Sequence, residues 1–110
     1  MTKATFYQNR DGEFTGFQVY DHSGAGEQGS DVVCAAISAL VINTINSIDE
    51  LTDDEFSCES DEDNASISLS IQPEHSGTTD VLIRSLIIGL TNLEEDEDSR
   101  DYIDVIFEEV

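Results

Sequence analysis

Residues 31–48 read Asp-Val-Val-Cys-Ala-Ala-Ile-Ser-Ala-Leu-Val-Ile-Asn-Thr-Ile-Asn-Ser-Ile, and this run sets the architecture of the chain. Its apolar residues recur at helical spacing, and Asp31 or Ser30 offers an N-cap, so we expect a helix to about Ile48. The main apolar stripe consists of Val33, Ile37, Leu40, Val41, Thr44 and Ile48. Further apolar residues leave hardly any polar face. Such a helix must be covered on more than one side, by a second helix, a dimer partner, or both.

The segment before this helix predicts a β-hairpin. Lys3–Gln8 and Phe14–Tyr20 are rich in aromatic and β-branched residues, and the Asp11-Gly12 pair between them suits a tight turn. The second strand ends next to His22. Three glycines then lie within 23–30, so this loop is either mobile or ordered around something that it binds.

The second half of the chain predicts three more elements after a long acidic connection. We expect 49–65 to be a solvated loop, because its acids do not follow the calcium-binding pattern of an EF-hand. Alternation predicts a strand at 66–72, helical spacing predicts a helix from 79 to about 93, and alternation predicts a last strand at 102–108. The acids at 94–98 should end the second helix, because its dipole disfavours them there.

Together these elements predict an α+β fold in the order β-β-α-β-α-β. We expect an antiparallel or mixed sheet with two helices packed on one face. At 110 residues the chain has the length of one domain, so we assign residues 1–110 to a single domain.

The charge of the chain restricts its partners. There are 25 acidic residues against 4 basic ones, giving a formal charge of −21. Direct binding to nucleic acid or to an anionic membrane is therefore not expected, whereas a basic protein would be attracted. We expect no signal peptide at Met1, no apolar run of membrane-spanning length and, with two cysteines, no disulfide framework. We expect a cytoplasmic protein.

Cys34 and His22 form a candidate catalytic pair. An isolated cysteine in an apolar run is more often a core residue, but Cys34 lies in the first turn after Asp31, where unpaired N–H groups stabilise a thiolate. The sequence between them allows the imidazole of His22 to approach the sulfur and accept its proton. Zinc binding is not expected, because Cys58 and His75 are not at any familiar ligand spacing. We therefore expect no metal and no cofactor.

The motif around this pair resembles a known family. The segment reads His22-Ser-Gly-Ala-Gly-Glu-Gln-Gly-Ser-Asp31-Val-Val-Cys34-Ala-Ala-Ile-Ser38-Ala-Leu40 and is followed by Asn46. It resembles the ribosomal-processing cysteine protease family of bacteria, which includes the YsxB-like proteins. The family pattern has His, a glycine-rich loop with Gly-Glu-x-Gly, Asp, two aliphatic residues, Cys, small residues and Ser-Ala.

The resemblance implies a homodimeric endopeptidase that removes an N-terminal extension from a basic ribosomal protein of the large subunit, and so supports ribosome assembly. It implies Cys34 as nucleophile and His22 as general base. Two other positions match it: Asp31 either orients the imidazole or caps the helix, and Ser38 either shapes the pocket or faces a partner helix. We place Gly26 and Gly29 of the loop among the supporting or substrate-binding residues. The family has glycine before its histidine, where this chain has Asp21.

Two other functions remain open from the sequence. The first is a non-catalytic acidic interaction module, in which Cys34 is merely buried and its thiol is inert to alkylation. The second is a thiol-dependent regulator or hydrolase with the same site and a different client. A substrate screen separates this second function from ribosomal-protein processing.

Overall fold

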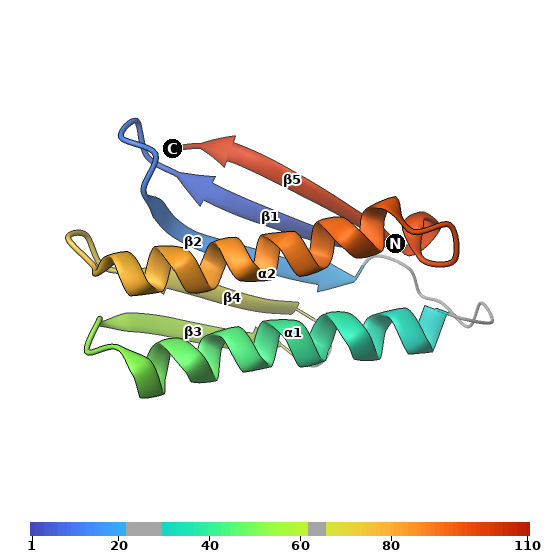
Figure 1. Cartoon of the computed structure of the whole chain (residues 1–110), viewed down its shortest axis with the longest axis horizontal. Helices are drawn as coiled ribbons and strands as arrows, with labels where there is room; N and C mark the ends of the chain where they lie inside the picture. Colours follow the sequence, from blue (N-terminus) through green and yellow to red (C-terminus); the bar gives the residue numbers. More distant parts are fainter. Residues whose placement is uncertain (22–29, 62–65) are drawn as a thin grey trace.

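The computed structural model describes residues 1–21, 30–61 and 66–110 and contains a sheet covered by two long helices (Figure 1). The elements, in chain order, are β1 (Thr2–Gln8), β2 (Phe14–Asp21), α1 (Ser30–Leu51), β3 (Phe56–Asp61), β4 (Ser66–Ile71), α2 (Gly77–Glu95), the short 3-10 helix η1 (Arg100–Tyr102) and β5 (Ile103–Glu109).

The five strands form one mixed sheet in the order β3-β4-β2-β1-β5. β1 pairs antiparallel with β2 and parallel with β5, while β2 and β3 both pair antiparallel with β4. Both helices lie across the same face of this sheet, side by side (Figure 1). The expected α+β fold, with a mixed sheet and two helices on one face, is therefore confirmed.

The expected element order lacks one strand. Phe56–Asp61, predicted as part of an acidic loop, forms the edge strand β3. Five of its six residues are exposed, so burial of its own side chains contributes little to its formation. The strand exists because β4 offers an unpaired edge, and the acidic side chains of β3 suit a sheet edge that must not recruit another chain. The observed order is β-β-α-β-β-α-β.

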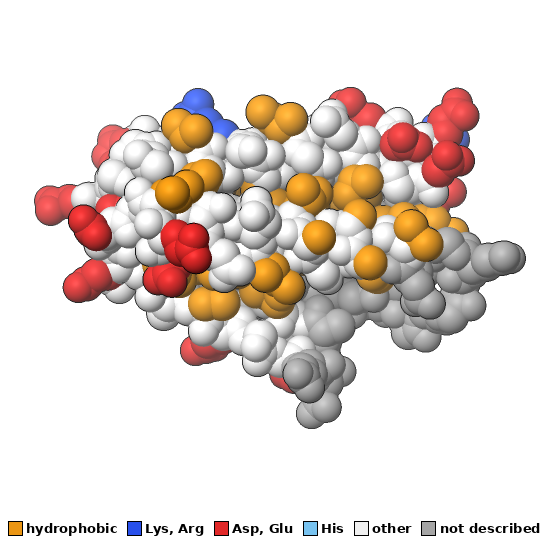
Figure 2. Space-filling model, turned by 60° about the horizontal axis from the view of Figure 1, so that its bottom comes forward, with side chains coloured by type: hydrophobic (Ala, Val, Ile, Leu, Met, Phe, Trp, Pro, Cys, Tyr) orange, Lys and Arg blue, Asp and Glu red, His pale blue; other side chains and the backbone are white. Residues whose placement is uncertain are grey.

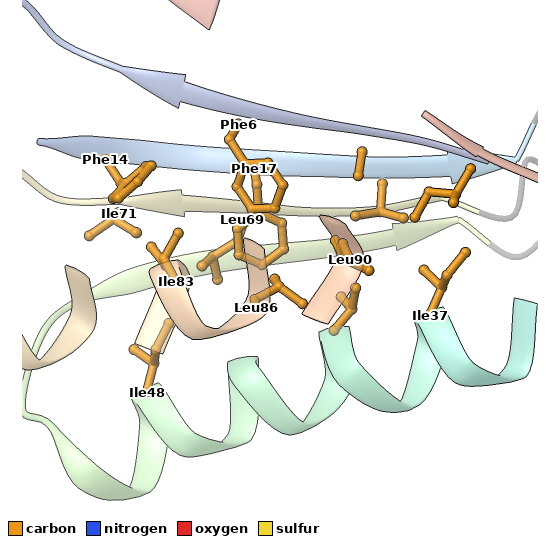
Figure 3. Packing of buried hydrophobic residues seen from close by; sticks show 14 of the residues in the cluster. Phe6, Phe14, Phe17, Ile37, Ile48, Leu69, Ile71, Ile83, Leu86 and Leu90 are labelled. Atoms are coloured by element: carbon orange, nitrogen blue, oxygen red, sulfur yellow. The ribbon is translucent and has the colours of Figure 1, made fainter. Parts of the chain in front are cut away.

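The hydrophobic core lies between the sheet and the helices (Figure 3). From the sheet, Phe6 and Phe17 pack with their ring centroids 5.6 Å apart, and Leu69 lies beside them. From the helices, α2 contributes Ile83, Leu86 and Leu90, while α1 contributes most of its predicted stripe. Within that stripe Val33, Ile37, Val41, Thr44 and Ile48 are buried, and Leu40 is half-buried against α2. The helical periodicity thus identified the buried face of α1 correctly.

The outer face of α1 remains apolar and exposed. Val32 is 75% exposed, Ile42 48% and Leu51 66%, and Val81 and Ile88 add exposed apolar groups on α2. Hydrophobic side chains accordingly run along the helix layer in Figure 2, while acidic groups gather toward its ends. α2 therefore covers only part of the apolar surface of α1, which the sequence predicted to be covered on more than one side.

The hydropathy of α1 corrects one expectation from the sequence. Residues Val32–Leu51 have a mean hydropathy of 1.6, so by length and composition the helix could cross a membrane. The expectation that no apolar run reaches that length is wrong on this measure. One such helix is weak support for a membrane span, because core helices pass the same test, and here its stripe packs on a sheet.

The turn between β1 and β2 follows the sequence signal. The Asn9 side-chain oxygen accepts hydrogen bonds from the backbone N–H groups of Asp11 and Glu13, both at 3.0 Å. Gly12 adopts a φ of 81°, which glycine reaches without steric cost. The predicted β-hairpin is confirmed.

The start of α2 is capped from another part of the chain. The Asp54 carboxylate accepts hydrogen bonds from the Ser76 backbone N–H at 2.9 and 3.0 Å and from the Ser76 hydroxyl at 2.6 Å. The buried Thr79 hydroxyl also donates to it. The hydrogen bonds from the Ser76 and Thr79 hydroxyls lower the pKa of Asp54. This contact joins the segment between α1 and β3 to the start of α2.

Candidate active site

The site is organised around Cys34, near the start of α1. Because the helix begins at Ser30, Cys34 is its fifth residue and opens the second turn. The sequence predicted a first-turn position, and the structure places Cys34 one residue beyond that turn because the helix begins at Ser30. The N–H groups that have no partner within the helix belong to the turn preceding Cys34, and helix side chains lean toward that turn. The sulfur thus remains on the side of the helix that favours negative charge.

The Cys34 side chain is half-buried and borders a small hollow. Its Sγ lies 3.9 Å from the Oγ1 of Thr2, a hydrogen-bonding contact between α1 and β1. The hollow has a volume of about 100 Å³ and is lined by Thr2, Val19, Cys34, Ile37, Ser38, Val41 and Ile67. Its wall is mainly aliphatic, so the thiol faces a place that can receive part of an apolar side chain.

Ser38 lies one turn after Cys34 and lines the same hollow. Ser38 as a whole is exposed to solvent. Of the two roles left open by the sequence, this position suits shaping the pocket, since the side chain borders the space beside the thiol.

The remaining predicted site residues lie wholly or partly outside the described residues. His22, Gly26 and Gly29 fall in 22–29, which the structure does not describe. For Asp31 the structure describes only the backbone, which belongs to the first turn of α1. Asp21, the residue before His22, ends β2 and pairs with Thr2 in the sheet.

The second cysteine and second histidine lie elsewhere. Cys58 is an exposed residue of β3, although partial burial of its thiol, followed by the charge of Glu59, raises its pKa. His75 lies before α2 and contacts the Asp80 carboxylate at 2.7 Å through Nε2. Within the described ranges, no three His, Cys, Asp or Glu side chains are grouped to hold a metal ion.

Sequence reasoning missed Thr2 as part of this site. The hairpin strand was expected to start at Lys3, whereas β1 begins at Thr2. Extending the alternation of the buried Ala4 and Phe6 by one step would have placed Thr2 on the same inner face. Its contact with Cys34 depends on how α1 crosses the sheet, which the sequence pattern does not encode.

A half-buried thiol near a helix start, beside an apolar hollow and a hydroxyl, is an arrangement in which a cysteine can serve as a nucleophile. Comparison with known families agrees: the family model for "Cysteine protease Prp" matches residues 1–104. The chain therefore belongs to the Prp family of cysteine proteases.

Named relatives and solved structures are similar along most of their lengths. The ribosomal processing cysteine protease Prp of Bacillus subtilis is 28% identical over 100 residues, covering 87% of this chain and 89% of the relative. SMU.848 from Streptococcus mutans has a TM-score of 0.85 and 28% identity, covering 100% of this chain and 96% of that one. The Prp of Staphylococcus aureus, solved with a substrate peptide, has a TM-score of 0.89 at 20% identity, covering 98% and 100%. That last likeness shows the fold.

Proposed function

We propose that this protease removes an N-terminal extension from a large-subunit ribosomal protein, with Cys34 as nucleophile and His22 as general base. The observation that carries the proposal is the half-buried Cys34 thiol at the rim of an apolar hollow in a Prp-family chain. The relatives named as ribosomal processing proteases favour this function over a non-catalytic acidic module.

The proposed reaction follows the chemistry of a thiol nucleophile. His22 takes the thiol proton, and the Cys34 sulfur attacks the scissile carbonyl carbon. Unpaired N–H groups at the start of α1 are the proposed donors to the oxyanion. When the C–N bond breaks, the proton passes from His22 to the leaving amine and an acyl-thioester remains on Cys34. Water, deprotonated by His22, then releases the acid product and restores the thiol.

Chain connectivity supports the role of His22. Asp21 pairs with Thr2, and Thr2 contacts the Cys34 sulfur, so β2 ends beside the nucleophile. His22 follows Asp21 directly, and consecutive Cα atoms are about 3.8 Å apart. We further propose that Asp31 orients the imidazole or caps α1. Ser38 shapes the substrate pocket in this proposal, while Gly26 and Gly29 help to admit the substrate.

The charge of the chain supports a free ribosomal protein as the client. A chain of formal charge −21 attracts a basic client and is repelled by the phosphates of ribosomal RNA. Cleavage in the cytoplasm, before assembly and without nucleic acid or membrane contacts, is the corresponding proposal. The free client should be cut faster than the ribosome-bound one, and equal rates would remove this part of the proposal.

We also propose that the protein is a homodimer joined through the outer face of α1. Val32, Ile42 and Leu51 of this helix are exposed within one chain, which leaves an apolar surface to cover. Sedimentation should give a dimer at micromolar concentration. Ile42→Glu should dissociate it, whereas Ser70→Glu, a charge placed on the opposite face of the sheet, should not. A wild-type monomer at every concentration would contradict the dimer.

The activity is tested with the client itself. The purified protein is incubated with the extended ribosomal protein, and the products are identified by mass spectrometry beside a Cys34→Ala control. We expect one cut that releases the extension, and none with the control. An uncut client, in the presence of a folded wild-type protein, would refute the proposed function.

A further inference from the structure

We propose that Thr2 is a positioning residue for the nucleophile: its hydroxyl donates a hydrogen bond to the Cys34 sulfur and stabilises the thiolate. This inference rests on the proposed role of Cys34. It concerns a residue from a different element, β1, that the catalytic motif around Cys34 does not include.

The geometry holds the hydroxyl in place. Thr2 is 4% exposed. Among the described residues, its hydroxyl has one hydrogen-bonding contact, with Cys34 Sγ at 3.9 Å. β1 lies inside the sheet, so Thr2 is paired on both sides, with Asp21 of β2 and with Ile103 of β5. The branched side chain of threonine further restricts its rotation. The donor therefore meets the sulfur with little reorganisation.

The direction of the hydrogen bond follows from the state of the sulfur. A neutral thiol either donates to Oγ1 or accepts from it, but a thiolate has no hydrogen and only accepts. Thr2 must then act as donor, so its hydrogen bond is stronger for the charged form. Among the described residues lining the hollow, Ser38 is the other one with a hydroxyl, and the rest besides Cys34 are aliphatic. In such surroundings each donor has a large effect on the charge.

The position of Cys34 in the helix makes a second donor valuable. The N–H groups that have no partner within the helix belong to the preceding turn, so they favour a charge on the sulfur without Cys34 being one of the first-turn residues. The dipole effect falls off within the first turn. A hydroxyl delivered from the sheet adds to this effect.

Alkylation of Cys34 by iodoacetamide, followed across pH by peptide mapping, tests the inference without any client. Thr2→Val keeps the shape and removes the hydroxyl, and it should raise the midpoint of the alkylation profile by about one pH unit. Thr2→Ser restores the donor and should stay near wild type. Thr5→Val is the matched control, because Thr5 is buried on the other face of β1 and should leave the profile unchanged. Cys58 alkylation in the same samples should not move.

Cleavage measurements separate this inference from the proposed function. At pH 7, Thr2→Val should lower kcat about tenfold with KM unchanged, because the hydroxyl acts on the sulfur. A wild-type alkylation profile in Thr2→Val, or an equal shift in Thr2→Ser, would overturn the inference even if the client is cut. If the profile shifts as expected but no client is cut, Thr2 retains its effect on Cys34 and the proposed function fails. Should Thr2→Val melt early, Thr2→Ala replaces it with the same expectation.

Discussion

The starts of the two helices present the same backbone chemistry to different groups. At α2, the Asp54 carboxylate bonds the Ser76 N–H and two hydroxyls, so the positive end of the helix meets a negative charge of the protein itself. Near the start of α1, the Cys34 thiol has the uncharged Thr2 hydroxyl as a neighbour and borders an apolar hollow. A carboxylate thus binds at the start of α2, whereas a thiol near the start of α1 borders a hollow.

The difference shows how one physical property serves stability and chemistry. A helix start stabilises a negative charge wherever one is supplied. Asp54 supplies it in the folded protein itself, whereas in the proposed reaction the charge at α1 develops on the thiolate or on the oxyanion of the substrate. Changes at the α1 start should therefore alter catalysis and leave the fold, while changes at the α2 start should do the reverse.

The largest effect is expected at the α1 start itself. Cys34→Ala and Cys34→Ser should abolish cleavage and keep a wild-type circular dichroism spectrum, because both residues suit the beginning of a helix. Cys58→Ser should cut at the wild-type rate, since Cys58 lies on the edge strand β3 and does not line the hollow beside Cys34. Turnover by either Cys34 variant would remove Cys34 from the mechanism.

The two histidines provide a matched test across the two regions. His22→Asn should lower kcat by about 100-fold or more, the usual contribution of a general base. His75→Asn, near the α2 start, should leave kcat unchanged. A comparable loss of kcat in both variants, with both folded, would mean that the starts of α1 and α2 do not differ in function as proposed.

A smaller effect is expected from the cap of α2. Asp54→Asn should lower the melting temperature at pH 7 by roughly 4 °C, typical of a lost helix cap, and leave kcat near wild type. Asp53→Asn, an exposed neighbour, serves as the control. Because the folded pKa of Asp54 is lowered, its contribution is present above pH 3.8 and is lost as pH falls through the folded value. A difference in melting temperature that persists at the most acidic pH would contradict a role for its charge.

The smallest effect concerns His75. Burial lowers the pKa of His75, but hydrogen bonds to Asp80 and to the Gln72 carbonyl, and the charges of Asp80 and Asp54, raise it on balance. The charged ring therefore adds stability below pH 6.5, which is lost as pH rises through the folded pKa. His75→Gln should melt about 1–2 °C below wild type at pH 5.5 and equal it at pH 9. An equal deficit at both values would indicate lost packing and not lost charge.

The sequence predicted those elements whose own residues carry a strong local signal, either a hydrophobic periodicity or a turn motif. The stripe of α1, the repeat of α2 and the Asn9–Gly12 turn each have a local cause, and all three appear in the structure. β3 was missed because its exposed polar residues carry almost no hydrophobic period, and its strand conformation comes from pairing with β4. Elements formed by a partner strand are poorly visible in their own sequence.

The candidate site also contains residues that one element predicts and a residue that only the fold brings to them. Cys34 and Ser38 were identifiable from one helix, because residues one turn apart share a face. Thr2 was not, since its contact with Cys34 links residues 32 positions apart and requires the crossing of α1 over the sheet. The roles of His22, Gly26 and Gly29 remain predictions from the motif.

The central claim is that Cys34 attacks the scissile carbonyl of the extension. The most direct measurement is labelling with a peptide that carries the extension sequence up to the cut and ends in a chloromethyl ketone, read by peptide mapping of the folded protein. We predict a single adduct on the peptide containing Cys34, protection by excess client, and no adduct on Cys58. A label confined to Cys58, or cleavage that continues when Cys34 is fully labelled, would contradict the account.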